Sequence, residues 1–289
     1  MDFFVKLHTL LDGKMETPGN YGWFHLLFFG IVIVATVLLC VFFKDAKNKT
    51  VNLIVLITWL IIVVLEIYKQ LNYGFSVEDG KLVWDYQWYA FPFQFCSSVH
   101  YVLPFIVFLK EGKIRDSFIS FMGAFCLFGG IAVMFYPNDV FISTIGINIQ
   151  TMVHHGAQVV MGIFLTVHQR NKLGIFHYLK SIPVFAAFSI LAIIMNEIAF
   201  YSGLQETFNM FYISSHYPCT LPILSQIYEN VPYIVFLLIY LLGFIHVSAI
   251  VYFAQFGIIK LVKLLIKLVK LLINIVKKLV NKIKSKKTC

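Results

Sequence analysis

The sequence predicts an all-α polytopic membrane protein: a bundle of seven transmembrane helices with its N-terminus outside, followed by a basic amphipathic helix on the cytoplasmic surface. Three observations lead to this fold class. The 289 residues are 60% hydrophobic and only 13% charged, whereas soluble domains are nearer half apolar and a quarter charged. The apolar residues form runs of about 20, long enough to cross a bilayer as helices whose backbone hydrogen bonds are all internal. The excess positive charge is confined to one end of the chain.

The predicted elements follow one another in three parts. Residues 1–20 are expected to form an N-terminal interfacial segment, residues 21–254 the transmembrane domain, and residues 255–289 the basic helix. Short polar sequences such as KDAKNKT and KEGKIRD separate the apolar stretches, as expected of loops. The seven predicted spans are 21–43, 51–71, 89–109, 117–137, 148–168, 181–203 and 231–254.

The distribution of lysine and arginine predicts the orientation of these spans. The first, third and fifth loops carry nine basic residues, whereas the second, fourth and sixth carry only Lys81. Basic residues are enriched in cytoplasmic loops, so the odd-numbered loops are expected inside. We therefore expect a multi-pass protein of the plasma (cytoplasmic) membrane.

The C-terminal segment has a regular polar stripe. From Lys260 to Lys287 there are ten lysines and no acidic residue, and the rest of the chain is nearly neutral. On a helix this spacing gives a narrow polar stripe and a wide apolar face, typical of an interfacial helix. We expect anionic lipid headgroups as its partner and no nucleic acid, while a coiled coil or a terminus without function remain alternatives. The membrane-surface residues are Lys260, Lys263, Lys267, Lys270 and Lys277.

Several polar residues within the predicted spans lie at similar depth. At a rise of about 1.5 Å per residue, they lie roughly 8–11 Å below the outer surface. Ionisable groups inside a membrane are costly and usually serve a function, so we expect them to converge on one site. The candidates are Glu66, Cys96, His154, His155, Asn196 and Glu197, with Gln94 and Ser97 beside the cysteine.

The residue types of this layer predict thiol chemistry. A cysteine becomes nucleophilic beside a base, and histidine can serve as that base. Cys96 is the expected nucleophile, and His155 is preferred to His154 as the base because Gly156 leaves room for a substrate. Glu197 or Asn196 is expected to orient the histidine. Because histidines four residues apart are absent, we expect no metal and no cofactor.

Several motifs resemble those of the YwaF-type integral membrane proteins. They include FPFQFCSSVHYVLPF at 91–105, HHGAQVVMGIFL at 154–165 and FNMFYISSHYPCTLPI at 208–223. That family is similar to a eukaryotic family of membrane phospholipid acyltransferases. The resemblance implies a nucleophile at Cys96 and a base at His155. Family members often carry a histidine two residues before the cysteine, where this chain has Gln94.

Three functions are compatible with these observations. The first is an intramembrane lipid acyltransferase or acyl-ester hydrolase that uses the Cys/His site. The second is a non-enzymatic membrane binder or carrier, in which Glu66 belongs to a buried proton- or cation-linked site together with His155 and Glu197. The third is a membrane scaffold that acts through its basic tail. The oligomeric state does not follow from the sequence.

Overall fold

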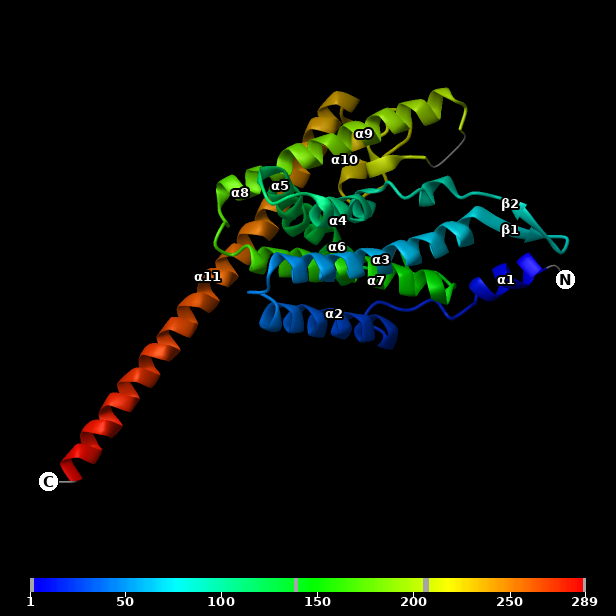
Figure 1. The fold of residues 1–289 in the computed structure, drawn as a ribbon. Helices are drawn as coiled ribbons and strands as arrows, with labels where there is room; N and C mark the ends of the chain where they lie inside the picture. Colours follow the sequence, from blue (N-terminus) through cyan, green and yellow to red (C-terminus); the bar gives the residue numbers. More distant parts are fainter. Residues whose placement is uncertain (1–2, 138–139, 205–207, 288–289) are drawn as a thin grey trace.

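A computed structural model describes residues 3–137, 140–204 and 208–287, and the side chains up to residue 278. The described chain is helical apart from one small hairpin (Figure 1). The first described element is helix α1 (Phe3–Leu11), which lies within the predicted N-terminal segment. The principal helices are α2 (Trp23–Phe42), α3 (Asn48–Gly74), α4 (Ser98–Phe108), α5 (Lys113–Phe121), α6 (Leu127–Phe135), α7 (Ile145–His168), α9 (Ser181–Tyr201) and α11 (Tyr233–Lys287).

The remaining elements are short. A five-residue π-helix, Met122–Cys126, joins α5 to α6 without a break, so that 113–135 is one continuous helix. The others are α8 (Ile175–Leu179), α10 (Leu224–Asn230), strands β1 (Phe75–Glu78) and β2 (Lys81–Trp84), and the 3-10 helices Trp88–Ala90, Phe95–Ser97 and Met210–Tyr212.

Five helical segments of the described chain are long and apolar enough to span a membrane. They are Trp23–Phe42, Asn48–Gly74, Lys113–Phe135, Ile175–Tyr201 and Tyr233–Lys278. The chain is therefore a multi-pass membrane protein, but the predicted count of seven spans and their orientation are not confirmed. The predicted fifth span is the 24-residue helix α7, which does not meet the same apolar criterion.

The predicted third span, 89–109, is not one long helix. Its first half contains Pro92 and two separate 3-10 turns, and only Ser98–Phe108 forms an α-helix. Proline lacks an N–H donor and disfavours helix in the residue before it, which explains why the helix begins only after this segment. The irregular segment carries Gln94, Cys96 and Ser97, and it is packed inside the protein, where side chains can satisfy its backbone.

Helices α6 and α7 approach closely because glycine lies at their contact. A Cβ added at Gly130 would lie 2.8 Å from both the Cβ of Gln158 and the backbone oxygen of His155. A Cβ added at Gly162 would lie 2.8 Å from the Cβ of Leu127. Small residues allow this approach between helices in membranes. The contact fixes α7, and with it the polar side chains described below, against α6.

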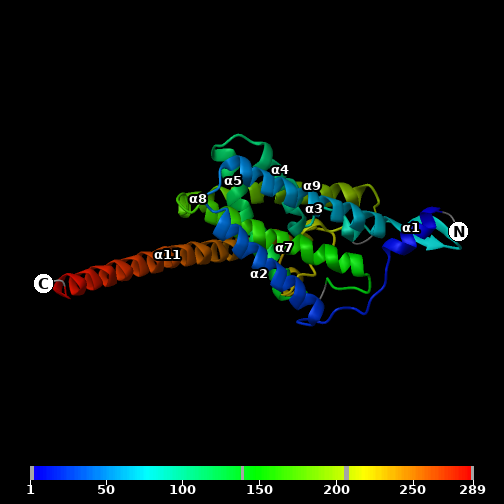
Figure 2. The same ribbon diagram turned by 60° about the horizontal axis from the view of Figure 1, so that its bottom comes forward.

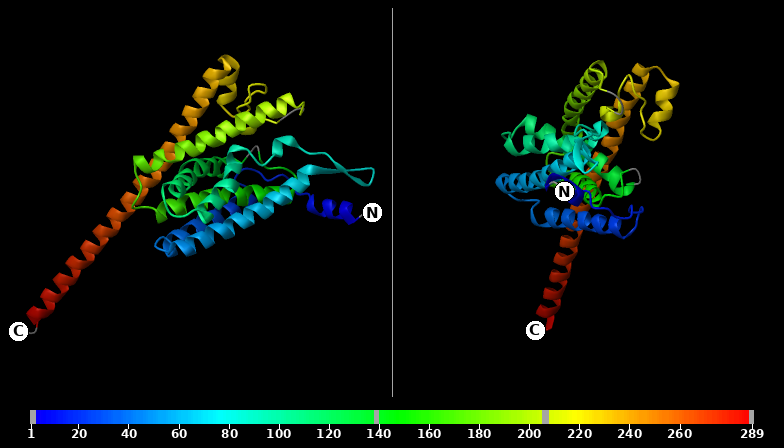
Figure 3. Two further views of the ribbon diagram at one scale, coloured as in Figure 1. Left: turned by 45° about the horizontal axis from the view of Figure 1, so that its top comes forward. Right: turned by 90° about the vertical axis from the view of Figure 1, so that its right-hand side faces the viewer.

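Helix α11 is much longer than the bundle is thick. It runs obliquely across the other helices, and its C-terminal half projects away from them in each view (Figures 1, 2 and 3). The helix passes through the predicted domain boundary at residue 255 without interruption. Residues 261–278 are all exposed. The basic segment thus continues the helix of the last predicted span, 231–254, without a break.

Candidate functional site

The site is built on one face of α7, which carries Gln150, His154 and Gln158. Residues four apart lie above one another on a helix, so these three form a polar stripe. Their exposed fractions are 4%, 4% and 0%, so the stripe is buried. Gln150 donates to Glu66 on α3, and His154 reaches the segment before α4. The stripe therefore joins three elements inside the bundle.

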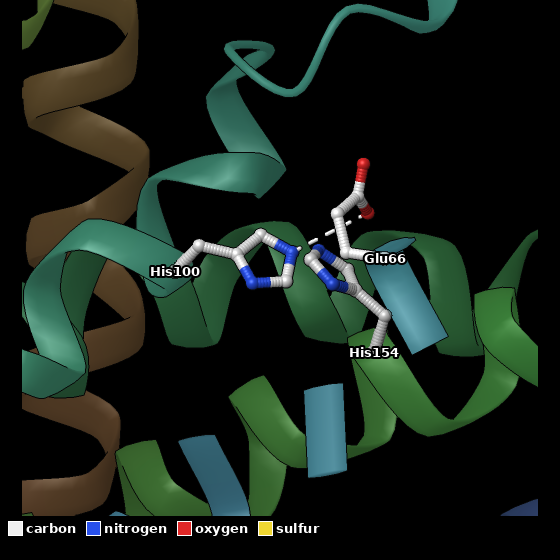
Figure 4. Close-up of side chains that lie close together, drawn as sticks. All are labelled: Glu66, His100 and His154. Atoms are coloured by element: carbon white, nitrogen blue, oxygen red, sulfur yellow. Dashed lines mark ion pairs between the residues drawn. The ribbon is translucent and has the colours of Figure 1, made fainter. Parts of the chain in front are cut away.

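Glu66, His100 and His154 gather at the centre of this region (Figure 4). The Nε2 atom of His100 lies 3.4 Å from Oε2 of Glu66, and the rings of His100 and His154 are 4.8 Å apart between centroids. Each residue comes from a different helix: α3, α4 and α7. A carboxylate and two imidazoles thus meet where each is less than a tenth exposed.

The Glu66 carboxylate is held by four neighbours. Lys69 lies 2.8 Å from Oε1, and Gln70 donates to the same oxygen at 2.6 Å. Gln150 donates to Oε2 at 3.2 Å, beside His100. These contacts provide the pairing and hydrogen bonds that a buried charge requires. The hydrogen bonds continue outward, because the Tyr86 hydroxyl donates to the side-chain oxygen of Gln70. Burial and the charge of Glu66 raise the pKa of Tyr86 to about 12.

Among the described residues, one group could hold a metal ion by residue type and distance. It consists of Glu66, His100 and His154, whose possible ligand atoms lie within 4.8 Å of one another. Two imidazoles and a carboxylate are ligands that zinc accepts. Here, however, both carboxylate oxygens already accept hydrogen bonds, and the Lys69 ammonium supplies the compensating positive charge. A dication would lie next to that ammonium, which is electrostatically unfavourable. The arrangement is better explained as a charge-paired polar cluster.

Cys96 lies beside this cluster. It belongs to the 3-10 helix Phe95–Ser97, and its carbonyl oxygen lies 3.1 Å from Nε2 of His154. Because a carbonyl can only accept, Nε2 of His154 carries the proton and Nδ1 holds the lone pair. That Nδ1 atom is buried and has no hydrogen-bond partner among the described residues. No hydrogen bond joins the Cys96 thiol to an imidazole of the described chain.

His155 has a different environment. Its Nδ1 lies 2.8 Å from the carbonyl oxygen of Thr151, one turn earlier on α7. The next residue, Gly156, faces α2, because a Cβ there would lie 2.5 Å from Val32. The space expected beside Gly156 is therefore occupied by α2. His154, and not the preferred His155, is the histidine that reaches Cys96.

A model of the TMEM164 family matches residues 20–256 of this sequence. The chain belongs to the TMEM164 family. The match includes every residue of the cluster and of the polar stripe, and it ends where the basic segment begins. The YwaF-type resemblance is not confirmed as the family of this chain. Comparisons with curated proteins and with solved structures find no match.

Asn196 and Glu197 lie outside the cluster in this TMEM164-family protein. Asn196 binds both the N–H and the carbonyl of Met210, at 2.7 and 3.0 Å. Glu197 accepts from Ser215 and lies 2.9 Å from Nε2 of His216. The structure therefore places neither next to His154, and both hold the connection between α9 and α11. The residues that do lie next to His154 are Glu66 and His100.

Gln94 also secures this connection. Its side chain accepts from the N–H of Phe211 at 2.9 Å and donates to the carbonyl of Asn209 at 3.1 Å. Phe211 is buried and has a φ of 58°, which is unusual for a bulky residue. Ser97 is buried next to Cys96, at the start of α4. Gln94 thus positions a strained loop beside the cysteine segment.

An apolar groove leads to the cluster. It has a volume of about 760 Å³ and is lined mainly by aromatic and aliphatic residues of α3, α4 and the hairpin, with Glu66, Gln70 and His100 among its few polar groups. Its α3 wall extends from Trp59 to Leu71, which corresponds to about 18 Å of helix. Ile67, Trp84 and Phe105 on its walls are exposed, so the groove opens at the surface of the protein.

Sequence reasoning missed His100, Gln150 and Gln158. His100 is not among the residues that the sequence predicts for the site, although it lies only four residues after Cys96. The spacing of Gln150, His154 and Gln158 is the signal that could have identified the inward face of α7. It also distinguishes His154 from its neighbour, because adjacent helical residues point about 100° apart.

Proposed function

We propose that this TMEM164-family protein transfers or hydrolyses fatty acyl groups of membrane lipids, with Cys96 as nucleophile and His154 as base. The single observation that carries the proposal is the placement of the His154 ring on the Cys96 segment, with an unpartnered basic nitrogen. A nucleophilic cysteine requires a base of this kind. The acyltransferase relationship implied by the sequence resemblance supports the same chemistry.

The proposed reaction begins with transfer of the Cys96 thiol proton to Nδ1 of His154, directly or through one water. The thiolate attacks the ester carbonyl, the new C–S bond forms, and the carbonyl electron pair moves onto oxygen. When this tetrahedral intermediate collapses, the C–O bond breaks and the leaving alkoxide takes the proton from His154. A second alcohol or water then releases the acyl group by the reverse sequence. Catalytic hydrogen bonds often shorten only when substrate binds.

Glu66 and His100 act as positioning residues in this proposal. His154 becomes positively charged during the reaction, and the nearby Glu66 carboxylate favours that charge. The His100 ring fixes the His154 ring from the α4 side. The groove beside Glu66 and His100 provides an apolar channel suited to an acyl chain. A second candidate function, lipid binding without chemistry, rests on the same groove.

Adjacent histidines provide a matched test. We expect Cys96→Ser to abolish acyl transfer from labelled phospholipid in nanodiscs, and His154→Gln to reduce its rate by about 10²-fold or more. His155→Gln should change the rate by less than about threefold, because its ring is held away by Thr151. Lipid turnover and the acylated Cys96 peptide would both be measured by mass spectrometry. Equal losses at His154 and His155, or turnover in Cys96→Ala, would contradict the assignment; lipid binding without acylation would support the carrier.

We also propose that the basic end of α11 binds anionic headgroups. The described residues from 261 to 278 are exposed, and their lysines lie on one stripe of an otherwise apolar helix. The family match ends at residue 256, so this segment is an addition to the shared bundle. It is consistent with membrane attachment that is independent of the catalytic site.

A further inference from the structure

Gln158 has no hydrogen-bond partner in a place where an amide needs one. Its side chain is completely buried, and neither Nε2 nor Oε1 bonds to any described residue. An amide removed from water without partners costs free energy. Such a group in a folded protein calls for an explanation. The position of this amide provides one.

The Gln158 amide and the Cys96 thiol border the same small space over α6. The point where a Cβ would stand at Gly129 is 3.2 Å from the Cys96 Sγ and 3.4 Å from Oε1 of Gln158. The same point is also 3.2 Å from Cε1 of Phe95, so these three side chains pack closely around Gly129. Gln158 also lies one turn beyond His154 on the same face of α7. Nucleophile, base and amide therefore converge from two sides.

The backbone fixes where the amide stands. The Cβ of Gln158 faces Gly130, where an added Cβ would lie only 2.8 Å away. The Gln158 side chain thus begins at the tightest part of the α6–α7 contact and has little freedom to move elsewhere. Donors that are fixed before the reaction stabilise developing charge without reorganisation. The unpaired Gln158 amide, whose Cβ is fixed beside the nucleophile, meets this requirement after a rotation about its terminal torsion.

We propose that the Gln158 side-chain N–H is the oxyanion donor for acyl transfer at Cys96, an inference that rests on the proposed function. When the thiolate adds to a lipid ester carbonyl, the carbonyl oxygen becomes negatively charged and accepts a hydrogen bond from Gln158 Nε2. The ester group enters next to Gly129, where the Phe95 ring moves aside to admit it, so that its carbon meets Sγ and its oxygen meets the amide. Rotation of the amide about its terminal torsion presents nitrogen in place of oxygen, since the two are similar in shape.

The test compares two reactions of the same thiol. Acylation by a lipid ester passes through an oxyanion, whereas alkylation by iodoacetamide displaces iodide at a saturated carbon and forms none. We expect Gln158→Met, which is close in volume and lacks the donor, to slow acylation of Cys96 by about 10²–10³-fold. The rate of alkylation should stay within about twofold of wild type. Both rates would be measured on the Cys96 peptide of the full-length protein in nanodiscs.

A second variant guards against misfolding. Gln158→Asn keeps the amide but withdraws it by one methylene, and it should show the same selective loss of acylation. Gln255→Met is the matched control, because Nε2 of Gln255 already donates to the carbonyl of Gly123 at 2.7 Å; it should not slow acylation selectively.

Each outcome is decisive. Equal loss of acylation and alkylation in both Gln158 variants would overturn the inference and assign Gln158 a packing role. Unchanged acylation in Gln158→Met would overturn it while leaving the Cys96 mechanism intact. A wild-type protein that is alkylated at Cys96 but never acylated would overturn the proposed function, and this inference with it.

Discussion

Glu66 and Lys69 lie one turn apart on α3, and their ion pair determines whether a buried carboxylate is tolerated beside two histidines. Their side chains are 10% and 16% exposed, and the N–O distance is 2.8 Å. Removing one partner of a buried pair leaves the other uncompensated, at a cost of about 3–5 kcal/mol. We therefore expect Glu66→Gln to destabilise the protein by about 3 kcal/mol, measured by denaturant titration in mixed micelles.

The double variant Glu66→Gln/Lys69→Met separates this effect from simple packing. It removes both charges, so we expect it to be more stable than Glu66→Gln alone. If the two substitutions are additive, the ion pair does not stabilise Glu66 and the carboxylate depends on His100 and the glutamines instead. Circular dichroism of each variant would verify that the helices are retained.

At the residue scale, the sequence indicated which residues could form the cluster better than it indicated which way their side chains point. The structure brings together Glu66, Cys96 and His154, three of the residues that were expected at one depth. Choosing between adjacent histidines requires the rotation of α7, which is set by its contact with α6 at Gly130. Asn196 and Glu197 share the predicted depth, yet they bond to the loop that follows α9. Depth alone therefore could not identify which side chains meet.

At the element scale, the α6–α7 contact can be tested directly. Gly130→Ala would place a Cβ against the backbone oxygen of His155, which cannot move without shifting α7. We expect overpacking to destabilise the protein by about 1–3 kcal/mol and to reduce acyl transfer by moving His154 relative to Cys96. Thermal unfolding in detergent and the lipid turnover assay would measure the two effects.

Gly243→Ala provides the matched control for this prediction. Gly243 lies within α11, and nothing stands within 4 Å of an added Cβ. Alanine is favoured over glycine inside a helix by roughly 0.5–1 kcal/mol, so this variant should be neutral or slightly more stable. A Gly130→Ala protein that behaves like Gly243→Ala would show that α6 and α7 separate easily.

Local sequence signals explain which elements could be predicted. Long apolar runs identified α2, α3 and α9 because hydrophobicity is the dominant signal for a span. The hairpin was not predicted, although Asp79-Gly80 is a typical two-residue hairpin turn and both residues have positive φ. The segment before α4 was predicted to be helical because it is apolar, but Pro92 and the packing of the segment inside the protein decide its conformation.

At the scale of the whole molecule, the length of α11 limits how the helix can lie in a bilayer. Its apolar part, Tyr233–Lys278, contains 46 residues, about 70 Å of helix at the usual rise. The hydrocarbon core is only about 30 Å thick. A straight α11 therefore cannot lie within the core along its whole length. Gly257 directly follows the last residue of the family match, and glycine is a weak helix former. We therefore expect the helix to bend there and the basic segment to lie along the membrane surface.

Lipid charge provides the test of this arrangement. A polarity-sensitive fluorophore at Leu268→Cys, in an otherwise cysteine-free protein, should report an apolar environment more strongly in anionic than in zwitterionic nanodiscs. Each lysine near an anionic surface contributes about 1 kcal/mol, so replacing Lys260, Lys263, Lys267, Lys270 and Lys277 by Gln should abolish the preference for anionic lipid. Replacement of the same five by Arg keeps the charge and should preserve it. A signal that ignores lipid charge but requires two copies in each nanodisc would instead establish the coiled coil, because the apolar face would then be covered by a second α11.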